Sequence, residues 1–142
     1  MVGLVVAAHG NLAEELLRTA EGVVGKLEQS LALSIHAGSS MDAARASLGE
    51  AIAAVDDGDG VLVLTDMFGG TPANLALTYL DGKIEVLTGV NLPMLLKLST
   101  CRAEKTGLEE TAQLLAAYGQ KNITRASELL RTRARSSRNS DS

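Results

Sequence analysis

Short apolar runs alternate with longer amphipathic segments along this 142-residue chain. Runs such as GLVVAA and VLVLT are continuously apolar, which is typical of strands buried on both faces of a sheet. The pattern predicts strands at about residues 3–8, 30–37, 61–65 and 84–88. Helical crossovers between them predict an α/β fold: a single-domain, doubly wound parallel four-stranded sheet with helices on both faces.

The segments between the strands have the spacing of helices that bury one face. We expect these helices at residues 11–25, 39–55, 72–80 and 91–119, the last with a break at Thr106-Gly107. Asn11 is the expected cap of the first helix, and Thr71 of the helix that opens with Pro72. After these helices, the segment NITRASELL is compatible with either a strand or a helix.

Charge is unevenly distributed along the chain. Residues 1–130 carry nine basic and sixteen acidic residues, a net charge of −7, whereas residues 131–142 carry four arginines and one aspartate. We therefore expect a domain over 1–130 and a basic, disordered tail over 131–142, with contact to an anionic partner as the alternative. The acidic domain has one Phe, two Tyr and no Trp, which argues against a nucleic-acid-binding module.

Cys101 is the only cysteine, so the chain cannot form an intrachain disulfide or a multi-cysteine metal site. Its helical setting predicts a small buried side chain. No basic segment precedes the first apolar run, and that run is too short to cross a bilayer. We expect a cytoplasmic protein that does not insert into membranes.

Two chemically active side chains stand where strands end. His9 follows the first apolar run and Asp66 follows the third. In a doubly wound sheet, ligands bind beyond the carboxyl ends of the strands, so both residues are expected at the ligand-binding side of the sheet. Asp66 could accept a hydrogen bond from one ring nitrogen of His9 and leave the other as a nucleophile. The alternative is a structural histidine and an aspartate that only caps a helix.

Glycines beside these two residues supply the remaining parts of a phosphoryl site. Gly10 permits a tight turn, and Gly69 and Gly70 allow successive N–H groups to face an anion. The Thr71 hydroxyl could donate a further hydrogen bond. Neither a nucleotide-binding motif nor a cluster of metal ligands is present in the sequence, so we expect no metal and no cofactor. His36, the other histidine, is expected to be structural.

The motifs AAHG, TDMFGGTPAN and GVNLPM occur in this order along the chain. With these three motifs, the chain resembles the enzyme IIA component of the mannose-family sugar phosphotransferase system over about residues 1–130. The resemblance implies a phosphocarrier, a protein-histidine phosphotransferase component. His9 would accept a phosphoryl group from phospho-HPr and pass it to a IIB partner, and Asp66 would pair with the ring nitrogen that is not phosphorylated. The hydroxyl of Thr71 would lie at the phosphoryl group.

The same resemblance implies the sheet order 2-1-3-4 and a homodimer in which the C-terminal strand, NITRASEL here, is exchanged between subunits. Phe68, Asn91 and Pro93 are candidate docking residues, although Asn91 and Pro93 equally fit a helix cap and first turn. Mannose-type proteins often carry a fused IIB domain, whereas an arginine-rich tail follows here, so the output could be transport or regulation. Two alternatives stay open: a non-covalent anion or small-ligand module of flavodoxin-like architecture, and a regulatory protein without phosphotransfer turnover.

Overall fold

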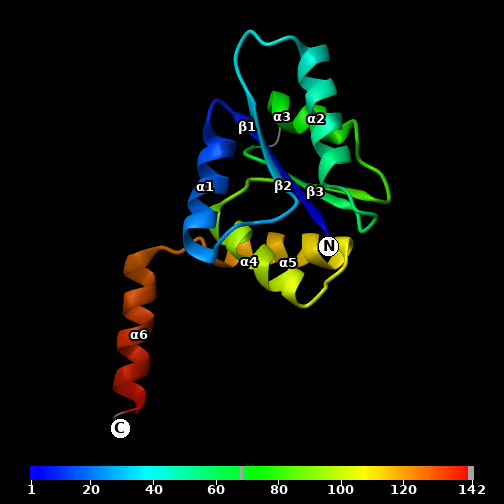
Figure 1. Ribbon diagram of the computed structural model, residues 1–142. Coiled ribbons are helices and arrows are strands. Elements are labelled where there is room, and N and C mark those ends of the chain that lie inside the picture. The colour runs from blue at the N-terminus through cyan, green and yellow to red at the C-terminus, as the bar shows by residue number, and fades with distance from the viewer. Residues whose placement is uncertain (68, 141–142) are drawn as a thin grey trace.

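A computed structural model describes residues 1–67 and 69–140 of the chain (Figure 1). Within these residues, four strands and six helices follow one another. Their bounds are β1 (Gly3–His9), α1 (Leu12–Val24), β2 (Ser30–Ile35), α2 (Met41–Val55), β3 (Val61–Thr65), α3 (Thr71–Leu77), β4 (Ile84–Thr88), α4 (Leu92–Ala103), α5 (Leu108–Lys121) and α6 (Ala126–Ser140). No helix in the described part is long and apolar enough to span a bilayer.

The strands form one parallel sheet in the order β2-β1-β3-β4, which confirms the expected fold. β1 lies between β2 and β3, with His9 opposite Ile35 in one direction and Ala7 opposite Thr65 in the other. Because all four strands run the same way, the loops that follow them meet at a single edge of the sheet. The order therefore places the end of β1 next to the end of β3.

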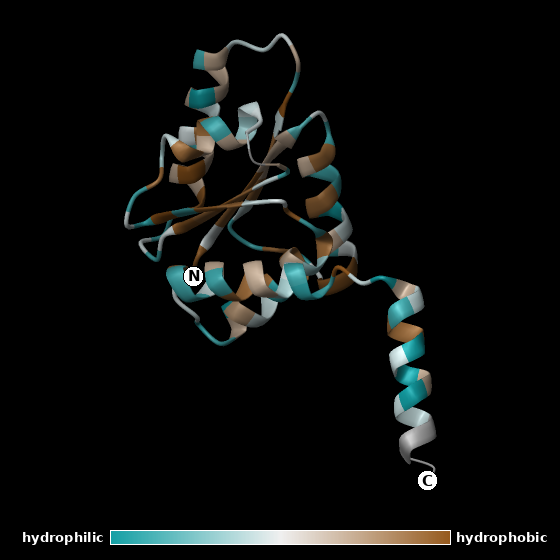
Figure 2. Ribbon diagram, turned by 180° about the vertical axis from the view of Figure 1, so that it is seen from behind, coloured by the Kyte–Doolittle hydropathy of each residue, from teal (hydrophilic) through white to brown (hydrophobic). Residues whose placement is uncertain are grey.

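Helices cover both faces of the sheet, and each face has its own apolar core (Figure 1). α1, α4 and α5 pack on one face, and α2 and α3 pack on the other. The central strands β1 and β3 are buried on both sides, as their continuous apolar sequences predict, and Figure 2 shows hydrophobic residues concentrated on the strands. The only cysteine, Cys101, is buried in α4, as predicted.

Two helix starts show how local sequence decides the boundaries. The Asn91 side chain caps α4, accepting a hydrogen bond from the backbone N–H of Met94 at 3.2 Å, as the cap interpretation predicted. The predicted cap of α3 is wrong: the helix includes Thr71, and Gly70 is its N-cap. Gly70 has an extended backbone, and its carbonyl oxygen accepts the first helical hydrogen bond from the backbone N–H of Asn74. The helix therefore begins one residue earlier than Pro72 suggested.

The C-terminal segment is helical from Ala126, which is one of the two states that the sequence left open for NITRASELL. Residues 126–140 form α6, so within this chain NITRASEL is not a strand, and the part of the tail expected to be disordered is helical as far as Ser140. Alanine, glutamate, leucine and arginine all favour helix, which explains the outcome in physical terms. The exchange of a C-terminal strand between two subunits stays a prediction about the dimer.

Thr65, the last residue of β3, is fully buried, and its hydroxyl has no hydrogen-bond partner among the described residues. It continues the row formed by Val61 and Val63, which belong to the core under α2 and α3. A valine would fill the same volume without a buried hydroxyl. An unpaired buried polar group costs about 1–3 kcal/mol, so this position lowers the stability of the fold.

We predict that Thr65→Val raises the free energy of unfolding by about 1–3 kcal/mol, because it removes the unpaired hydroxyl. Val63→Thr is the matched control, since it places a new hydroxyl two residues earlier on the same strand face and should lower stability by a similar amount. Urea unfolding of the three proteins measures both changes. If Thr65→Val were as destabilising as Val63→Thr, the hydroxyl would have a partner in solution.

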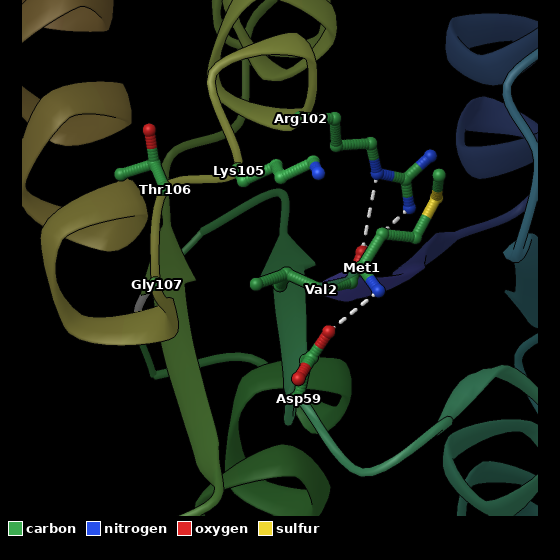
Figure 3. Close-up of a pocket in the computed structure, with 7 residues that line it drawn as sticks. All are labelled: Met1, Val2, Asp59, Arg102, Lys105, Thr106 and Gly107. Atoms are coloured by element: carbon green, nitrogen blue, oxygen red, sulfur yellow. Dashed lines mark hydrogen bonds and ion pairs between the residues drawn. The ribbon is translucent and has the colours of Figure 1, made fainter.

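At the end of the sheet opposite to His9, Arg102 of α4 binds the backbone just before β1 and just before β2, and Figure 3 shows its contact with Val2 before β1. Its guanidinium donates to the carbonyl oxygens of Val2 (2.8 and 3.1 Å), Glu28 (2.6 Å) and Gln29 (3.2 Å). Nearby, the Met1 amino group pairs with Asp59 at 2.6 Å. Burial lowers the pKa of Arg102, against the opposing charges of acidic neighbours. The Gln29 carbonyl also accepts from the backbone N–H of Leu4 at 3.0 Å, and the Glu28 carbonyl accepts from the Ser30 hydroxyl at 2.9 Å. Arg102 thus adds donors that link α4 to the starts of β1 and β2.

We predict that Arg102→Met lowers the free energy of unfolding by about 1–3 kcal/mol, because the Val2 carbonyl loses the donors it has among the described residues while the apolar stem is kept. Arg18→Met is the control: Arg18 is 74% exposed and, among the described residues, pairs with Glu15 alone, so its loss should change stability by less than about 0.5 kcal/mol. Thermal and urea unfolding measure both. Equal effects of the two substitutions would contradict the fastening role of Arg102.

Candidate active site

His9 and Asp66 meet at the carboxyl edge of the sheet. Nδ1 of the His9 ring lies 2.7 Å from Oδ2 of Asp66, and the backbone N–H of His9 donates to the same oxygen at 3.1 Å. The His9 side chain is 46% exposed, whereas the Asp66 side chain is only 13% exposed. The acid therefore lies beneath the imidazole and holds it, while the outer part of the ring faces solvent.

The hydrogen bonds of Asp66 set its charge. Burial alone raises the pKa of its carboxyl, but the hydrogen bonds from the ring and backbone of His9 outweigh burial, so the pKa lies below its ordinary value. The second carboxylate oxygen accepts from the backbone N–H of Met67 at 3.1 Å. An ionised carboxylate only accepts hydrogen bonds, so Nδ1 of His9 is the donor. In the neutral ring, Nε2 then carries the lone pair and is the nucleophilic atom.

Gly70 lies against the reactive side of the His9 ring. A Cβ at this position would be 2.7 Å from Cε1 and 3.3 Å from Nε2 of His9, closer than a side chain can approach without displacing the ring. Gly10 and Gly69 have φ values of 58° and 85°, which L-residues with side chains rarely adopt. The fit against the ring and the positive φ values thus favour glycine at these positions, and their contact with a phosphoryl group stays a prediction.

A hollow of about 540 Å³ opens beside His9 on the side of β2 and α2. Gly10 donates its N–H to the carbonyl of Ile35 at 3.0 Å, which joins the turn after β1 to the end of β2. Thr71, at the start of α3, also lines the hollow together with His9. The lining residues are His9, Gly10, Ile35, His36, Ala37, Gly38, Ser39, Met41, Ala44 and Thr71.

His36 lines this hollow although the sequence predicted only a structural role for it. It is exposed and follows the last residue of β2, next to the end of β1. The signal in the sequence was its place after the second strand. The order 2-1-3-4 that the resemblance implies places the ends of β1 and β2 side by side, so together with that order the signal could have placed His36 at the site.

The candidate docking residues have different surroundings. Besides capping α4, Asn91 donates its side-chain amide to the carbonyl of Gly119 at 3.1 Å, so both ends of its side chain already serve the fold. Pro93 is half-buried in the first turn of the same helix. Phe68 lies outside the described residues. Docking through these three residues stays a prediction.

Three apolar side chains are exposed on the segments that follow β1, β2 and β3. Leu12 is 44% exposed, Met41 53% and Met67 54%. Each begins or precedes an element at the edge that carries His9, and Met41 lines the same hollow. Exposed apolar side chains around a reactive group are typical of surfaces that bind another protein.

The described residues contain no group of three His, Cys, Asp or Glu side chains close enough to hold a metal ion. The chemistry available at this edge therefore consists of an oriented imidazole, a buried carboxylate and backbone N–H groups at glycines. This set can hold a nucleophilic nitrogen and surround a small anion attached to it.

Comparisons with known proteins agree with the sequence motifs. The family model described as the PTS system fructose IIA component, EIIA-man, matches residues 3–115. The PTS system mannose-specific EIIAB component of Escherichia coli (strain K12) is 31% identical over 124 residues, which are 86% of this chain and 38% of that protein. The PTS system fructose-specific EIIA component of Bacillus subtilis (strain 168) is 27% identical, over 92% of this chain and 90% of that protein.

Solved structures give the same result. Phosphotransferase system component EIIA from Streptococcus agalactiae superposes with a TM-score of 0.80 and 30% identity, over 90% of this chain and 99% of that one. The mannose/sorbose-specific IIA subunit from Enterococcus faecalis has a TM-score of 0.78 and 28% identity, over 87% and 93%. The chain therefore belongs to the mannose family of enzyme IIA components of the sugar phosphotransferase system.

Proposed function

We propose that this protein is a phosphocarrier that bears the phosphoryl group on Nε2 of His9. The observation that carries the proposal is the 2.7 Å hydrogen bond between Nδ1 of His9 and Asp66 at the exposed edge of the sheet. It orients the ring, directs Nε2 outward and provides a negative charge for the positive charge that develops on the ring during attack. Family membership supports a role in sugar phosphotransfer.

The transfer step would proceed in line between two imidazoles. The lone pair of Nε2 attacks phosphorus, the P–N bond to the donor histidine breaks, and the donor leaves with the electron pair of that bond. The bond made and the bond broken are of the same kind, so no further energy source is consumed. Gly69, Gly70 and the Thr71 hydroxyl would hold the phosphoryl oxygens, and the close approach of Gly70 to the ring supports this placement.

The donor in this proposal is an HPr-type phosphocarrier, and the acceptor is a IIB domain or a regulatory target. Leu12, Met41 and Met67 would contact the incoming protein, because they are exposed on the segments that follow β1, β2 and β3. The first curated relatives are EIIAB components, and the chain spans about 38% of their length. Transfer from His9 to a IIB domain is therefore part of this proposal. A homodimer and a cytoplasmic location stay predictions.

A non-covalent binding module is the second candidate, and one observation favours it. The hollow beside His9 is about 540 Å³, which is more than a phosphoryl group fills, so it could hold a small anionic ligand. In that case His9 would act only as a hydrogen-bond donor, and His9→Gln would preserve ligand binding. The phosphocarrier proposal requires that His9→Gln abolish phosphorylation.

We predict that wild-type protein incubated with phosphoenolpyruvate, enzyme I and HPr gains the mass of one acid-labile phosphoryl group, and that His9→Ala gains none. Asp66→Asn should slow phosphorylation by at least about a hundredfold while leaving the fold intact, because the ring loses its orienting charge. His36→Ala is the matched histidine control and should be phosphorylated. Intact-protein mass spectrometry at timed intervals measures all four, and an adduct on His9→Ala would contradict the proposal.

We predict that Gly70→Ala slows phosphorylation strongly while Gly69→Ala mainly lowers stability. A methyl group at position 70 would meet the imidazole 2.7 Å from Cε1, whereas a Cβ at position 69 would meet none of the described atoms beyond its chain neighbours within 4 Å. Position 69 has positive φ, so alanine there costs about 1 kcal/mol of backbone strain. Timed mass spectrometry and urea unfolding separate the two effects, and equal phosphorylation rates for both variants would argue against a tight fit at Gly70.

A further inference from the structure

Two imidazoles share the hollow at the carboxyl edge of the sheet. His9 is the last residue of β1, and His36 directly follows β2, the neighbouring strand. Both side chains are exposed, and both line the hollow of about 540 Å³. His36 takes no part in the hydrogen bond between His9 and Asp66, so it does not orient the reactive ring.

The main chain holds His36 in place although its side chain is exposed. The carbonyl of Ile35, the residue before it, accepts from the N–H of Gly10 at 3.0 Å, and the carbonyl of His36 itself accepts from the N–H of Ser39 at 3.2 Å. The second bond closes a β-turn in which Gly38 has a φ of 84°, a value that favours glycine at the third position of a turn. The His36 backbone is thus tied to the turn that follows β1.

The charge of a phosphoryl group would be poorly balanced in this hollow without His36. A phosphoryl group brings between about one and a half and two negative charges, and Asp66 beneath the His9 ring adds another. Among the described residues that line the hollow, His9 and His36 alone have side chains that can become positively charged. The hydroxyls of Ser39 and Thr71 can donate hydrogen bonds but cannot neutralise an anion.

The His36 ring is available for this role. Within the described residues it forms no hydrogen bond or ion pair, whereas the His9 ring is bonded to Asp66. Histidine commonly changes its charge near neutral pH, and a neighbouring dianion favours the charged form of the ring. Phosphorylation of His9 would therefore create the charge that attracts a protonated His36.

The reactive nitrogen faces the same space. A Cβ at Gly70 would be 3.3 Å from Nε2 of His9, so this atom lies toward the start of α3. Thr71, the next residue, lines the hollow together with His36. A phosphoryl group on Nε2 would enter a space that α3 borders on one side and the segment between β2 and α2 borders on the other.

We propose that His36 is a phosphoryl-binding residue, whose protonated imidazole donates a hydrogen bond to an oxygen of the phosphoryl group on Nε2 of His9. The His36 ring takes its proton from water and receives neither phosphorus nor electrons, so the bond made and the bond broken stay the same. Its effect is to stabilise the phosphorylated protein relative to the donor. The inference rests on the proposed phosphocarrier function, because His36 acts on the product of that reaction.

The equilibrium constant of phosphoryl transfer separates this role from docking. A residue that only contacts the donor protein changes the forward and reverse rates by the same factor, and it leaves the equilibrium between the separated proteins unaltered. A residue that binds the phosphoryl group stabilises the phosphorylated protein alone and therefore shifts the equilibrium.

The test measures how the phosphoryl group distributes at equilibrium between HPr and this protein, starting from phospho-HPr freed of enzyme I and phosphoenolpyruvate. His36→Gln should lower the equilibrium constant for transfer to His9 about tenfold, because an exposed charge-assisted hydrogen bond is lost. His36→Arg should stay within about threefold of the wild type, since guanidinium also binds phosphate oxygens. Both variants should still gain the phosphoryl mass and should unfold at the wild-type temperature.

Arg45→Gln is the matched charge control, because Arg45 is exposed on α2 but does not line the hollow. It should leave the equilibrium constant unchanged. A second readout is spectroscopic: the chain has two histidines, so substitution assigns the proton NMR signals of each ring. The ring signals of His36 should shift when the wild type is phosphorylated.

The outcomes distinguish this inference from the phosphocarrier proposal. An unchanged equilibrium constant in His36→Gln would overturn the role of His36 and leave the phosphocarrier proposal intact. Equal losses in His36→Gln and His36→Arg, or in His36→Gln and Arg45→Gln, would overturn it in the same way, as would unshifted His36 signals. Absence of a phosphoryl adduct on the wild type would overturn both.

Discussion

The hydrogen bond between the imidazole of His9 and the carboxylate of Asp66 is the constraint on which the site depends. It joins the ends of two strands that the chain separates by 57 positions. It can form only because β1 and β3 are neighbours in register and both end at this edge. The burial of the acid and the exposure of the ring follow from the same arrangement, because the carboxylate lies beneath an imidazole that faces solvent.

Backbone geometry around this pair is as restrictive as the pair itself. Gly70 brings main chain against the ring where any side chain would collide with it, and Gly10 turns the chain while bonding to the end of β2. The edge is thus built from three strand ends, with His9 in the middle. His36 and Asp66 flank it from the two neighbouring strands.

The carboxyl and amino ends of the parallel strands have different functions in this protein. At the carboxyl edge, polar groups stay exposed, and apolar side chains such as Met41 and Met67 remain uncovered. At the amino edge, Arg102 binds the carbonyl groups of two strand beginnings. The apolar cores between the edges keep β1 and β3 rigid, which holds the two partners of the site at hydrogen-bonding distance. The basic helix α6 belongs to neither edge and leaves the acidic domain altogether.

The sequence alone determined the local features of this protein. Continuous apolar runs predicted the strands, and His9 and Asp66 stood out because each directly follows such a run. Asn91 predicted the start of a helix. The strand order came from family resemblance, because pairing is a contact between segments far apart in the chain, which periodicity does not encode. The position of His36 in the hollow beside His9, the fit of Gly70 against the ring and the carbonyl contacts of Arg102 were decided only by the tertiary structure, because they depend on side-chain and loop placement. The helical state of α6 was open in the sequence, since its charge favoured disorder and its residue types favoured helix.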